Sequence, residues 1–141
     1  MKCVIDTSVD IKTYVPEQDS GKAIRLRNEY HQGVHQLIAP DIFPTEICNV
    51  LMILERSGKI KPSEADLFFR QFLNELPPLF AAIPLLPRAL EIAKQFQQTV
   101  YDCLYVALAE REGYDLVTAD DKLVKAVAPT LPFVLALSSV P

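Results

Sequence analysis

The chain has 141 residues, half of them hydrophobic, and its 14 lysines and arginines against 18 aspartates and glutamates give a net charge of −4. This length suits one domain with a sizeable core, residues 1–141. The acidic balance argues against a protein that coats nucleic acid through bulk positive charge. Asp6 interrupts the first apolar run, and no uncharged run reaches the length of a membrane span, so we expect a cytoplasmic protein without signal peptide or membrane segment.

The three cysteines, Cys3, Cys48 and Cys103, are odd in number, widely spaced and set in apolar surroundings. They form no C-x-x-C pair of the kind that indicates zinc binding or redox exchange. We therefore expect three buried free thiols in a reducing compartment.

The first half of the chain predicts two strands and four helices. In chain order these are the strand Cys3–Ile5, a short helix Ser8–Tyr14 ended by Pro16, a helix from Asp19 or Ser20 to Gln32, the strand Leu37–Ala39, and the helices Asp41–Ser57 and Ser63–Leu76. Asp19 or Ser20 is the expected N-cap of its helix. Gly33 and Gly58 are the expected ends of the helices that precede them.

The second half continues the alternation. It predicts a short strand within Leu79–Leu86, the helices Pro87–Gln98 and Thr99–Glu112, the strand Leu116–Thr118, a helix Asp121–Ala128 and a last strand Phe133–Leu137. Strands that alternate with helices over the whole length indicate an α/β fold with a mostly parallel sheet.

Asp6 and Asp120 each follow closely on a predicted strand. The carboxyl ends of parallel strands meet at one edge of the sheet, and ligands bind outside that edge in open α/β proteins. Both residues also suit the N-cap of the following helix, and the sequence leaves these interpretations open. Asp121 can share a site with Asp120, although capping of the last helix is the stronger interpretation for it. Asp10 is expected on the surface of the first helix.

Glu46 lies within the apolar face of a predicted helix, because its helical neighbours are Ile42, Phe43, Val50 and Ile53. A carboxylate there needs a partner, since a buried unpaired charge is costly or shifts its pKa until it is neutral. A structural ion pair, or a side chain that reaches solvent past the helix edge, is the alternative to a functional role.

Asp102 begins the run Cys103–Ala109, which is apolar on all sides and predicts a helix in the middle of the protein. The helix dipole and the capping pattern Thr99-x-x-Asp102 provide an adequate structural role for this acid. The number of acids in apolar settings, rather than any one of them, favours a shared site.

Convergence of Asp6, Glu46, Asp102 and Asp120 would be opposed by repulsion of roughly 4 kcal/mol for each pair at about 4 Å. No cluster of lysines or arginines is spaced to neutralise them, whereas oxygen ligands of this kind suit Mg²⁺ or Mn²⁺. Such an ion activates water and screens the charge of a phosphodiester. His31 and His35 are expected on the surface, and G-x-S-x-G, P-loop and G-x-G-x-x-G motifs are absent.

Four stretches resemble the PIN-domain nucleases, and within them the small VapC-type toxins of toxin–antitoxin pairs. They occur in the order of the family and are Val4–Ser8, Glu46 with Asn49 and Leu51, Tyr101–Glu110, and Leu116–Asp120. The resemblance implies a three-layer α/β/α domain in which the four acids hold Mg²⁺ or Mn²⁺ for endoribonuclease action on RNA. It also implies that Ser8 and Thr118 support the site by hydrogen bonding.

The resemblance further implies a homodimer and a cognate antitoxin that lies across the helices Asp41–Ser57 and Ser63–Leu76. Their apolar faces, rich in Phe68, Phe69 and Phe72, suit such contacts, and packing in the core is the alternative. Candidates for contact with RNA are Lys12, Arg88, Lys94 and Lys122, each of which also suits a solvated surface.

Two other functions are considered. A PIN-like module can bind RNA or protein without hydrolysis, and only cleavage that depends on a metal distinguishes it from an enzyme. A phosphoacceptor or phosphatase of the receiver or haloacid dehalogenase type also places Asp at strand ends. However, the stretch Asp6-Thr7-Ser8 lacks the second Asp of the dehalogenase pattern, and no lysine is well placed for a receiver.

Overall fold

The computed structural model describes residues 1–141 and contains five strands and seven α-helices. The strands are β1 (Lys2–Ile5), β2 (Gln36–Pro40), β3 (Leu79–Phe80), β4 (Asp115–Thr118) and β5 (Val134–Ala136). The helices are α1 (Thr7–Asp10), α2 (Ser20–His31), α3 (Phe43–Arg56), α4 (Glu64–Asn74), α5 (Leu86–Phe96), α6 (Val100–Glu112) and α7 (Asp121–Val127), with 3₁₀ turns η1 (Ile11–Thr13), η2 (Ile83–Leu85) and η3 (Leu137–Ser139). The alternation predicted from the sequence is confirmed.

All strand pairs are parallel, and the order across the sheet is β3-β2-β1-β4-β5. The chain leaves β1 toward β2 on one side and later returns to place β4 on the other side of β1. The strand order therefore reverses between β1 and β4, and a crevice opens outside their carboxyl ends. Ile5 pairs with Val117 in register, so both strands end at the same level of the sheet.

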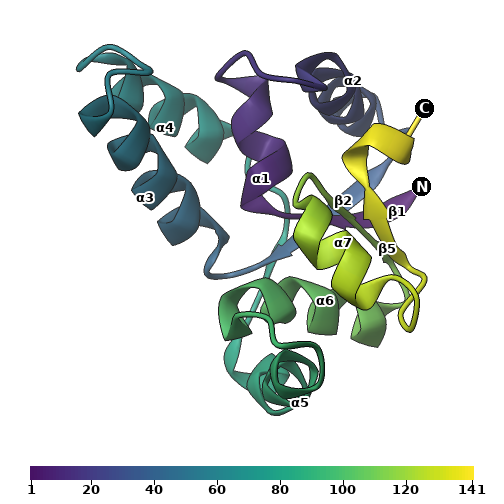
Figure 1. Ribbon diagram of the computed structural model, residues 1–141. Helices are drawn as coiled ribbons and strands as arrows, with labels where there is room; N and C mark the ends of the chain where they lie inside the picture. Colours follow the sequence, from purple (N-terminus) through teal and green to yellow (C-terminus); the bar gives the residue numbers. More distant parts are fainter.

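Helices cover both faces of the sheet, which confirms the three-layer α/β/α arrangement (Figure 1). Helix α6 packs against β1, β2 and β4, with α5 outside it, and α1 and α2 lie on the opposite face. Residues Cys103–Ala109 of α6 are all buried, as expected for a helix that is apolar on every side. No helix of the chain combines the length and the hydrophobicity needed to cross a membrane.

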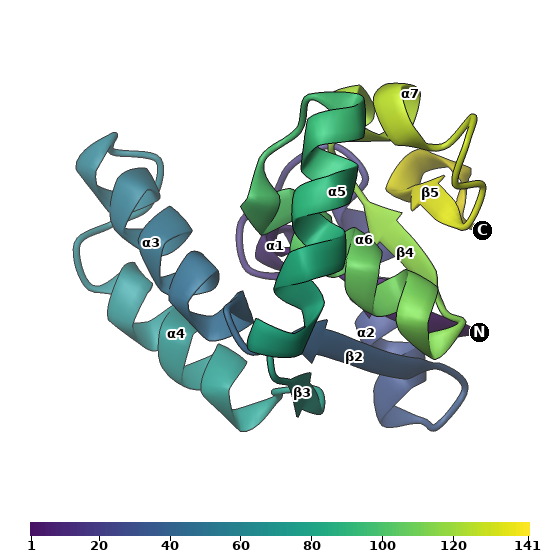
Figure 2. The same cartoon turned by 90° about the horizontal axis from the view of Figure 1, so that it is seen from below.

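Helices α3 and α4 pack against each other as a hairpin that projects from the sheet (Figure 2). Phe72 at its base is fully buried, and its ring packs edge-on against Phe43 with centroids 5.2 Å apart. Phe68 and Phe69 are partly buried against the same core. For Phe72 the structure therefore selects the core-packing alternative.

Two expectations about local structure hold only in part: Asp19 is the N-cap residue of α2, but without a capping side chain, and two of the three cysteines are buried. Asp19 lies at a positive φ of 64° and its side chain does not cap α2, while the Ser20 hydroxyl accepts a hydrogen bond from the Glu17 N–H at 2.8 Å. Cys3 and Cys103 are buried free thiols, but Cys48 is exposed. Cys48 directly follows the buried Ile47 on α3, and one step around the helix turns its side chain toward solvent.

Asp10 is fully buried, which contradicts its expected place on the surface. Its Oδ1 lies 2.8 Å from Nη1 of Arg27, a buried residue of α2, and Arg27 also donates to Oε2 of Glu75 at 3.0 Å. Burial raises the pKa of the Asp10 carboxyl to about 6, and the charge of Arg27 opposes that rise. The ion pair fixes α1, which carries the site described below, to α2.

Replacing Arg27 with methionine is expected to lower the free energy of unfolding by about 3–5 kcal/mol, because it leaves the buried Asp10 carboxyl without its partner. Urea denaturation followed by circular dichroism measures the change. Arg25→Met is the matched control, since Arg25 is exposed on the same helix. Equal stabilities of the two variants would show that the ion pair contributes nothing.

Candidate active site

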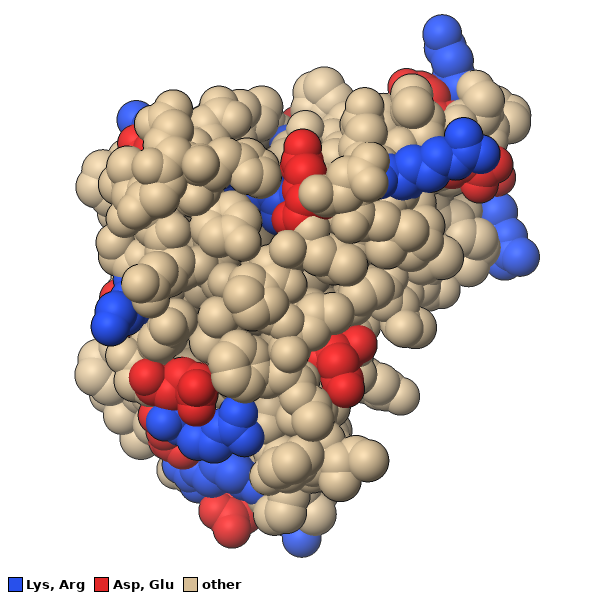
Figure 3. Space-filling model, turned by 180° about the vertical axis from the view of Figure 1, so that it is seen from behind, with Lys and Arg blue, Asp and Glu red and all other residues tan.

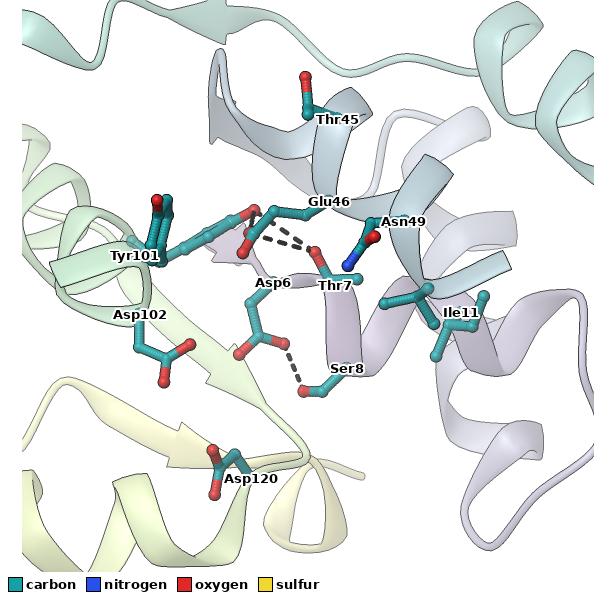
Figure 4. Close-up of a pocket in the computed structure, with 12 residues that line it drawn as sticks. Asp6, Thr7, Ser8, Ile11, Thr45, Glu46, Asn49, Tyr101, Asp102 and Asp120 are labelled. Atoms are coloured by element: carbon teal, nitrogen blue, oxygen red, sulfur yellow. Dashed lines mark hydrogen bonds between the residues drawn. The ribbon is translucent and has the colours of Figure 1, made fainter. Parts of the chain in front are cut away.

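A cavity of about 520 Å³ opens at the carboxyl ends of β1 and β4, bounded by α1, α3 and α6 (Figure 4). It is lined by Asp6, Thr7, Ser8, Ile11, Thr45, Glu46, Asn49, Val50, Tyr101, Asp102, Tyr105 and Asp120. The fold thus brings together the four acids singled out in the sequence. No lysine or arginine lines the cavity.

Asp6 is the residue between β1 and α1 and is held by three donors. Its Oδ1 accepts hydrogen bonds from the Ser8 hydroxyl at 2.5 Å and the Val9 N–H at 3.3 Å, and its Oδ2 accepts one from the Thr118 hydroxyl at 2.5 Å. Asp6 is thus both the N-cap of α1 and a wall of the cavity, so the two interpretations of the sequence hold together.

The hydroxyl groups of Ser8 and Thr118, which donate to Asp6, also connect the end of β1 to the end of β4. Ser8 Oγ accepts from the Ala119 N–H at 2.9 Å, and Thr118 Oγ1 accepts from the Asp120 N–H at 3.1 Å. Burial raises the pKa of Asp6 to about 6, and the hydrogen bonds that Ser8, Thr118 and Val9 donate to Asp6 oppose the rise because they stabilise its ionised form. The side chain is therefore fixed in position, and the role of Ser8 and Thr118 in a reaction stays a prediction.

Glu46 on α3 finds its partner in a neutral hydroxyl and not in a cation. The Tyr105 hydroxyl donates to its Oε1 at 2.6 Å, and the Thr7 hydroxyl lies 3.4 Å from the same atom. Burial raises the pKa of Glu46, and the bond from Tyr105 opposes that rise. The sequence predicted the need for a partner but did not identify Tyr105. The available signal was a tyrosine on a fully buried helix face, whose hydroxyl needs an acceptor.

Asp102 lies in the first turn of α6, where its backbone N–H is capped by the Thr99 hydroxyl at 3.1 Å, as the capping pattern predicts. Its negative charge raises the pKa of both Asp6 and Glu46. The pKa of Asp102 is itself raised, chiefly by burial and further by the charge of Asp120. Asp102 is thus close enough to each of the other three acids for their charges to interact.

Asp120 lines the cavity and also caps α7, because its Oδ1 accepts from the N–H groups of Lys122 and Leu123 at 3.1 and 3.2 Å. The expected capping by Asp121 is wrong, since Asp121 is the first residue inside the helix. Asp121 is exposed and lines a separate small hollow, so the structure does not bring it to the other acids.

The donor set of the cavity fits a hard divalent cation. The acidic side chains of its lining are the four carboxyl groups, and no basic side chain among the lining residues offsets their charge. No three His, Cys, Asp or Glu side chains are grouped tightly enough to hold one ion by themselves. Mg²⁺ characteristically binds one or two carboxylates and keeps several waters, so a site of this kind suits it.

The comparisons with known proteins agree with this fold. The family model of the PIN domain matches residues 3–128, and the chain belongs to that family. The chain is 36% identical over 129 residues to the protein named Ribonuclease VapC3 of Pyrobaculum aerophilum, an alignment that covers 87% of this chain and 92% of the relative.

Two solved structures share the fold. The PAE2754 protein of Pyrobaculum aerophilum superposes with a TM-score of 0.71 at 20% identity, covering 99% of this chain and 94% of the other. A chain of a toxin–antitoxin complex from Klebsiella pneumoniae superposes with a TM-score of 0.63 at 13% identity, covering 98% and 99%. Both confirm the PIN-like arrangement of the sheet and helices.

Tyr105→Phe is expected to raise the pKa of Glu46 further, because the carboxylate loses the donor that stabilises its charged form. The free energy of unfolding should fall by about 0.5–1.5 kcal/mol. Carbon-detected NMR titration of the carboxyl groups in metal-free protein measures the pKa. Tyr114→Phe, which removes a surface hydrogen bond to Gln36, is the control and should leave Glu46 unchanged.

Proposed function

We propose that the chain is a metal-dependent endoribonuclease and the toxin of a type II toxin–antitoxin pair. The observation that carries the proposal is the convergence of Asp6, Glu46, Asp102 and Asp120 on one cavity without a basic residue. Membership of the PIN domain family and the name of the Pyrobaculum relative, a ribonuclease, support it. An acidic site of this kind acts on a polyanion only when a cation offsets its charge.

The four acids would hold Mg²⁺ or Mn²⁺ together with several water molecules, because no three of them are grouped tightly enough to hold the ion by themselves. When bound, such an ion supplies an activated water for hydrolysis and neutralises charge on the phosphodiester. Ser8 and Thr118 keep Asp6 in place, and Tyr105 keeps Glu46 in place, through neutral donors. Because these donors add no positive charge, the full negative charge of the acids remains for the cation.

The contact with RNA is proposed to cover a small surface around the cavity. On the face of the molecule seen in Figure 3, lysines and arginines lie among acidic side chains and a broad area is uncharged. Among the candidates from the sequence, Lys12 pairs with Glu17 at 3.1 Å, and Arg88 forms a two-point ion pair with Glu110. Lys94 and Lys122 are exposed. On this proposal, binding depends on the cavity and its rim.

An antitoxin is proposed to cover the α3–α4 hairpin, and the toxin is proposed to be a cytoplasmic homodimer with one domain. The solved complex from Klebsiella pneumoniae, which shares the fold, is a toxin–antitoxin complex. Ile53, Leu67 and Leu73 of the hairpin are about half exposed, which suits burial by a partner. A single hydrophobic core of 36 buried residues supports one domain.

Asp6→Asn and Asp102→Asn are expected to reduce RNA cleavage by about 100-fold or more, because each removes charge that orients the cation. Cleavage of RNA in Mg²⁺ or Mn²⁺, with circular dichroism to confirm the fold, measures the effect. Asp66→Asn, an exposed acid of α4, is the matched control. Parental cleavage rates in either active-site variant would show that the site is assigned wrongly.

Removal of divalent cations tests the choice between an enzyme and a binding module. Purified protein, freed of any partner, is incubated with structured RNAs in Mg²⁺ or Mn²⁺ and in EDTA. We expect products only with the metal and recovery when it is added back. RNA that is bound but never cut under any of these conditions would favour the PIN-like binding module.

A further inference from the structure

The cavity has a second end that the metal chemistry does not use. Asp6, Asp102 and Asp120 lie at one end, whereas Asn49 and Ile11 lie at the other, between α3 and η1, and Thr45 lies farther along α3, beyond Glu46 (Figure 4). Ile11, Asn49 and Val50 carry no charge, and Glu46, one turn before Asn49 on α3, separates them from Thr45. Ile11 and Val50 are apolar, whereas Asn49 and Thr45, one turn apart on α3, are polar, exposed residues that line the cavity.

The chemistry of this neutral end suits a nucleobase and not a phosphate. Ile11 and Val50 offer apolar contact to the face of a flat ring. The amide of Asn49 presents both donors and an acceptor, and the hydroxyl of Thr45 presents one donor and acceptor sites, which together match the edge of a base. The whole cavity, about 520 Å³, lies in the range of pockets that enclose small organic ligands.

Tyr101 lies on the opposite wall, next to Asp102 in the first turn of α6 (Figure 4). It is 63% exposed, although aromatic residues of a small domain usually lie in its core, and its ring lines the cavity mouth. Exposed aromatic rings beside a site for nucleic acid are platforms on which bases stack, because every base has a flat face. The acids thus lie between a neutral pocket and an aromatic ring.

We propose that these two walls determine base preference at the cleavage site: Thr45 and Asn49 contact the edge of the base on one side of the phosphodiester, and Tyr101 stacks on the base on the other side. This inference rests on the proposed ribonuclease function in one respect: that function places the phosphodiester to be cut beside the acids. Both bases must leave a helical stack to reach these walls, so the bound segment is unpaired.

The test uses two readouts on a pool of single-stranded RNA 20-mers of random sequence. Sequencing the product ends after cleavage in Mg²⁺ or Mn²⁺ gives the base preference on each side of the cut. Fluorescence anisotropy of the labelled pool gives the affinity without relying on cleavage, and the same pool annealed to its complement gives the affinity for paired RNA.

Tyr101→Ala is expected to weaken binding of the single-stranded pool about 10-fold or more, whereas Tyr101→Phe keeps the ring and most of the affinity. Asn49→Ala and Thr45→Val are expected to change the base preference on one side of the cut only. Asn28→Ala, an exposed asparagine of α2 outside the cavity, is the matched control and leaves both readouts unchanged.

Unchanged affinity in Tyr101→Ala together with unchanged base preference in Asn49→Ala and Thr45→Val would overturn the proposal, as would equal affinity for paired RNA. The proposal would also be overturned if these variants changed only the binding of an antitoxin, and neither RNA affinity nor base preference. That result would assign the walls to a protein partner. If the parental chain cuts no RNA but its affinity depends on Tyr101, the ribonuclease function fails and stacking on Tyr101 stands.

Discussion

Repulsion among four carboxyl groups in one cavity is the constraint on which the rest of the site depends. Asp6, Glu46, Asp102 and Asp120 come from four separate segments, and no lysine or arginine shares their cavity. The parallel strand order places Asp6 and Asp120 together, because β1 and β4 are neighbours that end at the same level. Helices α3 and α6 then bring the other two acids from the sides.

The chain treats its buried acids in two different ways. Asp10 lies only four residues after Asp6, yet it is paired with the guanidinium of Arg27 at 2.8 Å and contributes to structure. Asp6, Glu46 and Asp120 instead receive hydrogen bonds from neutral groups, the hydroxyls of Ser8, Thr118 and Tyr105 and backbone N–H groups. Neutral donors position a carboxylate without cancelling its charge. This difference separates a structural ion pair from a site that attracts a cation.

The sequence predicted most of the fold because the strands are short apolar runs and the helices have clear periodicity. It also predicted the positions of Asp6 and Asp120, since strand ends in a parallel sheet share one edge. It missed the burial of Asp10, whose partner lies on another helix and makes contact only through tertiary packing. Tyr105 was missed for the same reason, because its hydroxyl meets Glu46 across the gap between α6 and α3. Local patterns do not reveal such pairings.

The direct test of the account is to locate a bound Mn²⁺ ion by anomalous diffraction in crystals grown with saturating MnCl₂. The account predicts an anomalous peak inside the cavity, contacting carboxylate oxygens among Asp6, Glu46, Asp102 and Asp120, and loss of that peak in Asp102→Asn. A cavity that stays without a peak at saturating Mn²⁺, or a peak of equal height in Asp102→Asn, would contradict it.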